Sequence, residues 1–170
     1  FEMLYNPEFF KKLSDEHKQG VLMHEFYHII YGHVTDRLPE GGMSKMWNIA
    51  TDLAINSYLR GKLPEGCCMP TVAPFEDYPL EQASEWYYEK LKKDQENGEG
   101  AFKNKGEPQD GEGQGSGGGQ PSENGEPSQG GGLPDTLDDH SGWGDADDET
   151  KQIAKERMKQ TILDATKEVN

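Results

Sequence analysis

The chain has little of what defines several common protein classes. Only two of its 170 residues are cysteines, Cys67 and Cys68, and they are adjacent. Neighbouring cysteines rarely bond to each other and offer no Cys-x-x-Cys spacing for a structural zinc site, so we expect reduced thiols in a cytoplasmic protein. The sequence has no apolar run of about 18 residues and no signal-peptide pattern, which predicts that it has no membrane partner.

Basic residues are also scarce. The chain has 17 Lys and Arg against 32 Asp and Glu, for a formal net charge of −15. Such a surface repels phosphate backbones, so we expect no nucleic-acid partner. Apolar residues make up only 32% of the chain, which leaves enough for one modest core.

Glycine is concentrated in one region. Thirteen of the 21 glycines fall between residues 94 and 134, a stretch built mainly of Gly, Glu, Gln, Ser, Pro and Asn. Such a composition cannot form a packed core. We therefore predict a folded domain over 1–93, a disordered, flexible linker over 94–134, and a C-terminal segment over 135–170 whose helix packs on the first domain. Because the chain starts at Phe1 without methionine, we expect it to be a processed or excised piece of a longer protein.

Capping signals predict a mainly α fold. Asn6, Ser14 and Ser44 are each suited to begin a helix. The second helix should run to about residue 32 or 33, and the third over 45–59. A fourth is predicted over 80–93 and a last over 148–169, with the proline-rich stretch 62–79 as loop. A small sheet or hairpin, which would make the fold α+β, stays open as an alternative.

The second helix carries the strongest motif, His24-Glu25-Phe26-Tyr27-His28. Residues four apart lie one turn above each other on the same helix face, so His24 and His28 can bind one Zn²⁺. Glu25 then lies beside the open position of the metal, where a carboxylate can act as general base.

The surroundings of the motif support a metal site. The helix is apolar nearly all round, with Leu22, Phe26 and Ile30 opposite the histidines, which predicts that it is central and buried. Buried histidines and a glutamate need a partner, and a metal ion supplies one. On a continued helix His33 points about 180° away from His24. We therefore predict that His33 is not a ligand and that it caps the helix C-terminus.

Asp52 is the leading candidate for a third metal ligand. It is a carboxylate within an otherwise mostly apolar predicted helix, with Asn48 and Asn56 one turn to either side. A buried Asp must be paired or bound to a metal. The alternative is that Asp52 orients a zinc histidine through its free ring nitrogen. Asp36 and Glu40 are weaker candidates, since both lie in a predicted loop.

Three further residues are candidates for the site. His140 follows the linker, and it could bind the metal, steady the oxyanion of a tetrahedral intermediate, or lie in a surface turn anchored by Trp143. Tyr27 and Tyr31 lie on the metal face of the second helix and are rival oxyanion donors.

Several motifs, in order, resemble a known family. They are Asn6-Pro7-Glu8-Phe9-Phe10, His24 to His28 with Gly32-His33, Trp47 to Asn56, Leu63-Pro64-Glu65-Gly66, Ala83 to Leu91, and Asp138-Asp139-His140-Ser141-Gly142-Trp143. Together they resemble a family of metallopeptidases whose larger members carry a C-terminal von Willebrand factor A-like domain. This sequence lacks that adhesion-type domain, so the partners recruited through it are not implied here.

The resemblance implies a zincin-like, mainly α domain that hydrolyses protein or peptide substrates. It places His24, His28 and Asp52 around Zn²⁺, with Glu25 as base. His/His/Asp sites accept several divalent ions, so the metal identity is not determined by these residues alone. Two other hypotheses stay open. One is a non-hydrolytic, zinc-stabilised protein-interaction module; the other is a peptidase kept latent by its own segment 138–143.

Overall fold

Helices begin where the sequence places capping side chains. The Ser14 hydroxyl accepts a hydrogen bond from the backbone N–H of His17 at 3.1 Å, and Ser44 accepts one from Trp47 at 3.1 Å. Asn6 caps the first helix through its side-chain oxygen. Each cap satisfies a backbone donor that has no partner within the helix. The three predicted helix starts are therefore confirmed.

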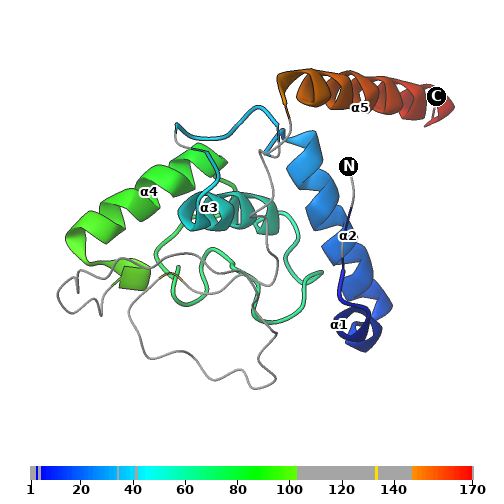
Figure 1. Ribbon diagram of the computed structural model, residues 1–170. Coiled ribbons are helices and arrows are strands. Elements are labelled where there is room, and N and C mark those ends of the chain that lie inside the picture. The colour runs from blue at the N-terminus through cyan, green and yellow to red at the C-terminus, as the bar shows by residue number, and fades with distance from the viewer. Residues whose placement is uncertain are drawn as a thin grey trace.

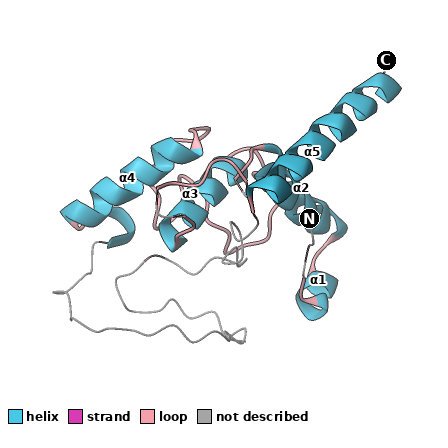
Figure 2. Ribbon diagram, turned by 45° about the horizontal axis from the view of Figure 1, so that its top comes forward, coloured by secondary structure: helices cyan, strands magenta, loops and turns pink. Residues whose placement is uncertain are grey.

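The described part of the chain is helical. The computed structural model describes residues 3, 5–33, 35–40, 42–102, 133 and 147–169, and these form helices and loops without a strand (Figure 2). In chain order the elements are α1 (Pro7–Lys12), α2 (Asp15–Ile30), α3 (Lys45–Asn56), α4 (Ser84–Asn97), the short 3₁₀ helix η1 (Gly100–Phe102) and α5 (Asp148–Val169) (Figure 1). The predicted mainly α fold is confirmed over these residues.

The central helix is α3. Every residue from Trp47 to Asn56 is buried, and α3 lies between α2 and α4 (Figure 1). Its apolar side chains form the core together with residues of α4, of η1 and of the loop that precedes α4: Phe75, Tyr78, Tyr87, Leu91 and Phe102. The core therefore surrounds the helix that carries Asp52.

The prediction that α2 is the central, buried helix is wrong. Its buried residues are Gly20, His24 and His28, whereas the side chains on its outer face are exposed. Phe26 is 56% exposed and Ile30 is 46% exposed. The reason is that α3 occupies the centre, so α2 packs only through the face that carries its two histidines.

The fourth helix begins and ends later than predicted. The run 80–83 stays outside it, because Glu81 has a φ of 59° and Ala83 is extended. At the other end Gly98 adopts a left-handed conformation and terminates the helix, as glycine does at this position. Residues 94–102, which were predicted to belong to the linker, are therefore folded.

Asp94 explains why folded structure continues into that range. It is 1% exposed, accepts a hydrogen bond from the Tyr78 hydroxyl at 2.7 Å, and pairs with the Lys90 ammonium at 2.5 Å. Burial, and then the hydrogen bond to Asp94, raise the pKa of the Tyr78 hydroxyl. The buried Phe102 completes this side of the core.

The last helix has the predicted bounds, Asp148–Val169. Lys155 on α5 pairs with Asp36 in the loop after α2 at 2.7 Å. Of the remainder of the proposed linker, 103–134, the structure describes only Leu133, so the division into three parts stays a prediction. None of the described helices combines the length and apolar composition needed to cross a bilayer.

At Gly20, α2 lies close to the loop after α3. A Cβ atom at this position would lie 1.9 Å from the backbone oxygen of Lys62. Alanine favours a helix over glycine by about 1 kcal/mol, but a clash with backbone forces the two segments apart. We expect Gly20→Ala to lower the free energy of unfolding by about 1–3 kcal/mol, measured by urea denaturation.

The exposed neighbour Gln19 provides the control for this prediction. Gln19→Ala should leave the urea midpoint nearly unchanged, because it places a methyl side chain on the exposed side of the same helix, where there is no clash. A Gly20→Ala protein as stable as the parent would show that α2 and the segment around Lys62 are not in such close contact.

Candidate metal centre

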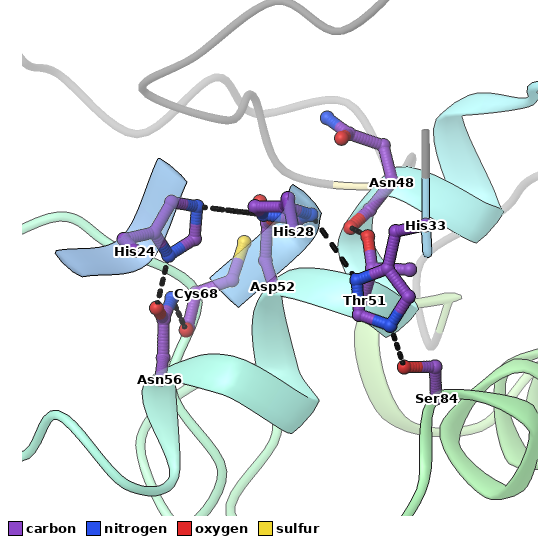
Figure 3. Close-up of polar contacts among 9 residues, drawn as sticks. All are labelled: His24, His28, His33, Asn48, Thr51, Asp52, Asn56, Cys68 and Ser84. Carbon is purple, nitrogen blue, oxygen red and sulfur yellow. Dashed lines mark hydrogen bonds and ion pairs between the residues drawn. The ribbon is translucent and has the colours of Figure 1, made fainter. Parts of the chain in front are cut away.

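The face of α2 that packs on α3 carries two histidines. His24 and His28 lie one turn apart and are 6% and 0% exposed. Their Nε2 atoms are 2.9 Å apart, and the two rings meet edge to face (Figure 3). The predicted geometry of the motif is therefore present, with both Nε2 atoms directed to one point.

Asp52 reaches the same point from α3. Its Oδ1 atom lies 3.2 Å from His28 Nε2 and 3.6 Å from His24 Nε2, and the residue is 3% exposed (Figure 3). One ligand atom from each of the three residues lies within 4.8 Å of the others. His24, His28 and Asp52 thus form a buried group that can hold a metal ion.

The hydrogen bonds of His24 test whether the group fits a metal. The Asn56 side-chain N–H donates to the Cys68 carbonyl at 2.7 Å, which orients its amide oxygen toward His24 Nδ1, also at 2.7 Å. An amide oxygen can only accept, so His24 carries its proton on Nδ1. The lone pair of Nε2 then faces Asp52 and His28. Two imidazoles and a carboxylate converging in this way suit a divalent cation.

Asn56, and not Asp52, faces the second ring nitrogen of His24. A metal-binding histidine commonly donates its second ring N–H to an oxygen acceptor, and Asn56 is that acceptor for His24. The sequence signal for Asn56 was its position one turn after Asp52. Because Asp52 faces the Nε2 atoms instead, its oxygen lies on the side where a metal would bind.

Glu25 lies beside the group without belonging to it. It is half-buried and lines a cavity of about 60 Å³ together with His24, Asp52 and Asn56. The remaining walls of that cavity are mostly apolar: Phe9, Val21, Leu63, Cys67 and Cys68. A carboxylate at the edge of a pocket next to a metal group can exchange protons with a molecule bound there.

His33 is placed by the end of α2. Gly32 is left-handed, with a φ of 71°, and the backbone N–H of His33 donates to the carbonyl of His28 at 3.0 Å. This pattern is the Schellman motif, so the predicted cap is present in the backbone. The ring of His33 turns inward instead, is fully buried, and lies with Nδ1 3.2 Å from Nδ1 of His28. His33 is not one of the three converging residues.

The other candidates are not brought into the group. Asp36 forms its ion pair with Lys155, and Glu40 lines a separate surface groove. Tyr27 and Tyr31 stack on each other with ring centroids 5.5 Å apart, and burial raises the pKa of Tyr31. Their predicted role as oxyanion donors stays a prediction. His140 and the rest of 138–143 lie outside the described residues.

The chain is similar to known proteins. A family model described as "Putative metallopeptidase domain" matches residues 2–169. A protein of Thermotoga maritima, named "Uncharacterized protein", is 37% identical over 57 residues, which are 34% of this chain. The match covers 14% of that relative, so the chain spans a small part of its length. No solved structure matches the chain.

Proposed function

Because the chain belongs to the family described as a putative metallopeptidase domain, we propose that it is a zinc-dependent metallopeptidase. The family match confirms the resemblance drawn from the sequence motifs. The observation that carries the proposal is the convergence of His24, His28 and Asp52 in one buried group. Two imidazole nitrogens and a carboxylate oxygen form a three-ligand set of the kind that leaves a fourth position open in catalytic zinc sites.

Glu25 is the proposed general base. Zinc held by the three ligands would supply a Lewis acid that polarises the scissile carbonyl and acidifies water. The Glu25 carboxylate accepts a proton from the water molecule that attacks the carbonyl carbon. As the C–N bond breaks, the Glu25 carboxyl group donates this proton to the leaving nitrogen. The immediate products are a carboxylic acid and an amine, the acid then gives its proton to the amine or to solvent, and Glu25 returns to its starting state.

The cavity beside Glu25 supports a peptide substrate. Phe9, Val21 and Leu63 give it apolar walls, and no Lys or Arg is among its described lining residues. Such walls favour an uncharged, apolar side chain next to the scissile bond, and a negative charge there would lose its hydration and face the Glu25 and Asp52 carboxylates. We therefore expect protein or peptide substrates with an apolar residue at the cleavage site.

A non-hydrolytic, zinc-stabilised interaction module is the second candidate. It is favoured by the position of the group, which joins α2 to α3 with ligands that are all buried. A metal shared between two helices stabilises their packing, because metal binding free energy contributes to folding. This candidate gives no role to Glu25, since a structural zinc needs no base.

Removal of the metal tests the proposed function. We expect a zinc chelator to abolish cleavage of a peptide library, followed by mass spectrometry, and added Zn²⁺ to restore it. The same treatment should lower the Tm, because zinc that binds only the folded state stabilises it. Added Mg²⁺ is the control and should not restore cleavage, because it prefers an octahedral shell of oxygen ligands. Cleavage that persists at zero metal content would contradict the proposal.

A further inference from the structure

His28 has a hydrogen-bonding arrangement different from that of His24. The second ring nitrogen of His24 faces an amide oxygen, whereas that of His28 faces another imidazole, at 3.2 Å from Nδ1 of His33. The far nitrogen of His33, Nε2, lies 2.9 Å from the hydroxyl of Ser84 (Figure 3). His28, His33 and Ser84 thus form a buried chain of polar atoms that leads from the metal group to the first residue of α4.

This chain of atoms has two proton arrangements. In one, Ser84 donates to His33, and His33 donates through Nδ1 to His28, whose proton is then on Nε2. In the other, His28 donates through Nδ1 to His33, and His33 donates through Nε2 to Ser84. Only the second arrangement leaves the Nε2 lone pair of His28 directed at the metal position, because a neutral imidazole carries one proton.

We propose that His33 is a positioning residue for the metal ligand His28. As a neutral ring with its proton on Nε2, it accepts the Nδ1–H of His28 and so fixes the tautomer of His28 that can bind a metal. Ser84 accepts from His33 and fixes the tautomer of His33 in turn. This inference rests on the proposed metal site and is independent of peptide hydrolysis.

The surroundings of His33 hold its ring in place. Gly32 adopts a left-handed conformation, which turns the backbone so that the His33 ring lies against the ring of His28. Trp47 packs edge to face against it, with ring centroids 6.3 Å apart. Arg37, four residues later, donates hydrogen bonds to both carboxylate oxygens of Glu85, the residue next to Ser84. Its Nε lies 3.0 Å from Oε1 and its Nη2 lies 2.5 Å from Oε2. The ion pair of Arg37 and Glu85 therefore connects the loop after α2 to the start of α4.

A matched pair of substitutions tests the proposal. His33→Asn keeps a polar side chain whose oxygen can accept at the δ position, whereas His33→Leu has the same branching and no acceptor. We expect His33→Leu to weaken zinc binding by about 10–100-fold, measured by competition with a chromophoric chelator, and His33→Asn to stay within about threefold of the parent. Thermal unfolding of the metal-free proteins shows whether both variants fold.

Histidine NMR on the zinc-loaded parent gives a test that needs no variant. Two-bond ¹H–¹⁵N spectra should show His28 protonated on Nδ1 and His33 protonated on Nε2. His33 protonated on Nδ1 in the loaded protein would overturn the proposal, since it could not then accept from His28. If His33→Leu does not fold, Ser84→Ala should still shift the His33 tautomer population while leaving that of His24 unchanged.

The outcomes separate this inference from the proposed function. A parent protein that does not bind zinc refutes the metal site itself. A parent that binds zinc, with Asn and Leu variants equal to it or equally weakened, refutes only the role of His33 and assigns it to packing. Zinc binding that is lost with Leu and retained with Asn supports the proposal, whether or not the protein cleaves peptides.

Discussion

Replacing Glu25 with Gln is expected to reduce peptide hydrolysis by about 10²–10⁴-fold while leaving zinc bound. The amide has the shape of the carboxylate but cannot accept the proton of the attacking water. Glu25 is half-buried at the cavity wall and is not one of the three converging residues, so the substitution should not disturb them. Peptide cleavage, zinc content and thermal unfolding of the same preparation are the three measurements.

The control for this result is Glu16→Gln, which makes the same chemical change on the exposed first turn of the same helix. It should leave hydrolysis, zinc content and Tm unchanged. If Glu25→Gln also retains full hydrolysis, Glu25 is not the base and the proposed mechanism fails. If neither the parent nor the variant cleaves peptides although both bind zinc, the interaction module becomes the better reading.

The parts of the site that lie on one helix could be predicted from the sequence. The spacing of His24 and His28 determines their common face as soon as the segment is helical, and Ser14 signals where that helix begins. Asp52 could be identified because a carboxylate in an apolar stretch needs a partner. Its register on α3 is supported by the cap at Ser44, which determines where that helix starts. Local rules thus placed His24, His28 and Asp52 on their helices, whereas their convergence in one buried group comes from the packing of α2 on α3.

The parts that depend on packing between distant segments could not be predicted. Ser84 lies 51 residues after His33, and no local pattern relates the two. The inward turn of the His33 ring follows from a left-handed Gly32, which the helical extrapolation did not include. Periodicity likewise showed that α2 is apolar but not that α3 would take the central position. An apolar face shows what a helix can bury, whereas the competing helices decide what it does bury.

The linker boundary was misplaced for a related physical reason. Composition changes at Asp94, where the sequence becomes rich in glycine and polar residues, yet Asp94 itself is buried between Tyr78 and Lys90. The two bonds of the buried Asp94 carboxylate keep this segment folded, although the average composition around it is typical of a linker. Phe102 adds an apolar contact to the core, which the average hydrophobicity of the surrounding polar segment does not indicate.

Asp52→Asn is expected to cause the second large effect, the loss of most of the zinc affinity. If three ligands share a binding free energy on the order of 10 kcal/mol, the loss of one charged ligand removes roughly 3 kcal/mol, which is about a 10²-fold weaker Kd. The amide keeps the shape of the side chain but has no negative charge. The two imidazoles are neutral, so no ligand of the variant balances the positive charge of the metal ion. Chelator competition measures the change.

The other buried carboxylate of the described chain, Asp94, distinguishes a metal ligand from a structural acid. It is 1% exposed but bonds to Tyr78 and Lys90, away from the histidines. Asp94→Asn should therefore lower the Tm with and without zinc while the zinc Kd of the folded protein stays unchanged. Asp52→Asn should instead remove the rise in Tm that zinc gives the parent.

Two results would contradict direct ligation by Asp52. An Asp52→Asn protein that keeps the Kd of the parent would show that the carboxylate is not a ligand, leaving His24 and His28 to be completed by another residue. A fall in zinc affinity no greater for Asp52→Asn than for Asn56→Ala would assign Asp52 an orienting role instead. Asn56 contacts His24 at Nδ1, on the side opposite the metal position, so its removal provides the comparison for the loss of an orienting residue.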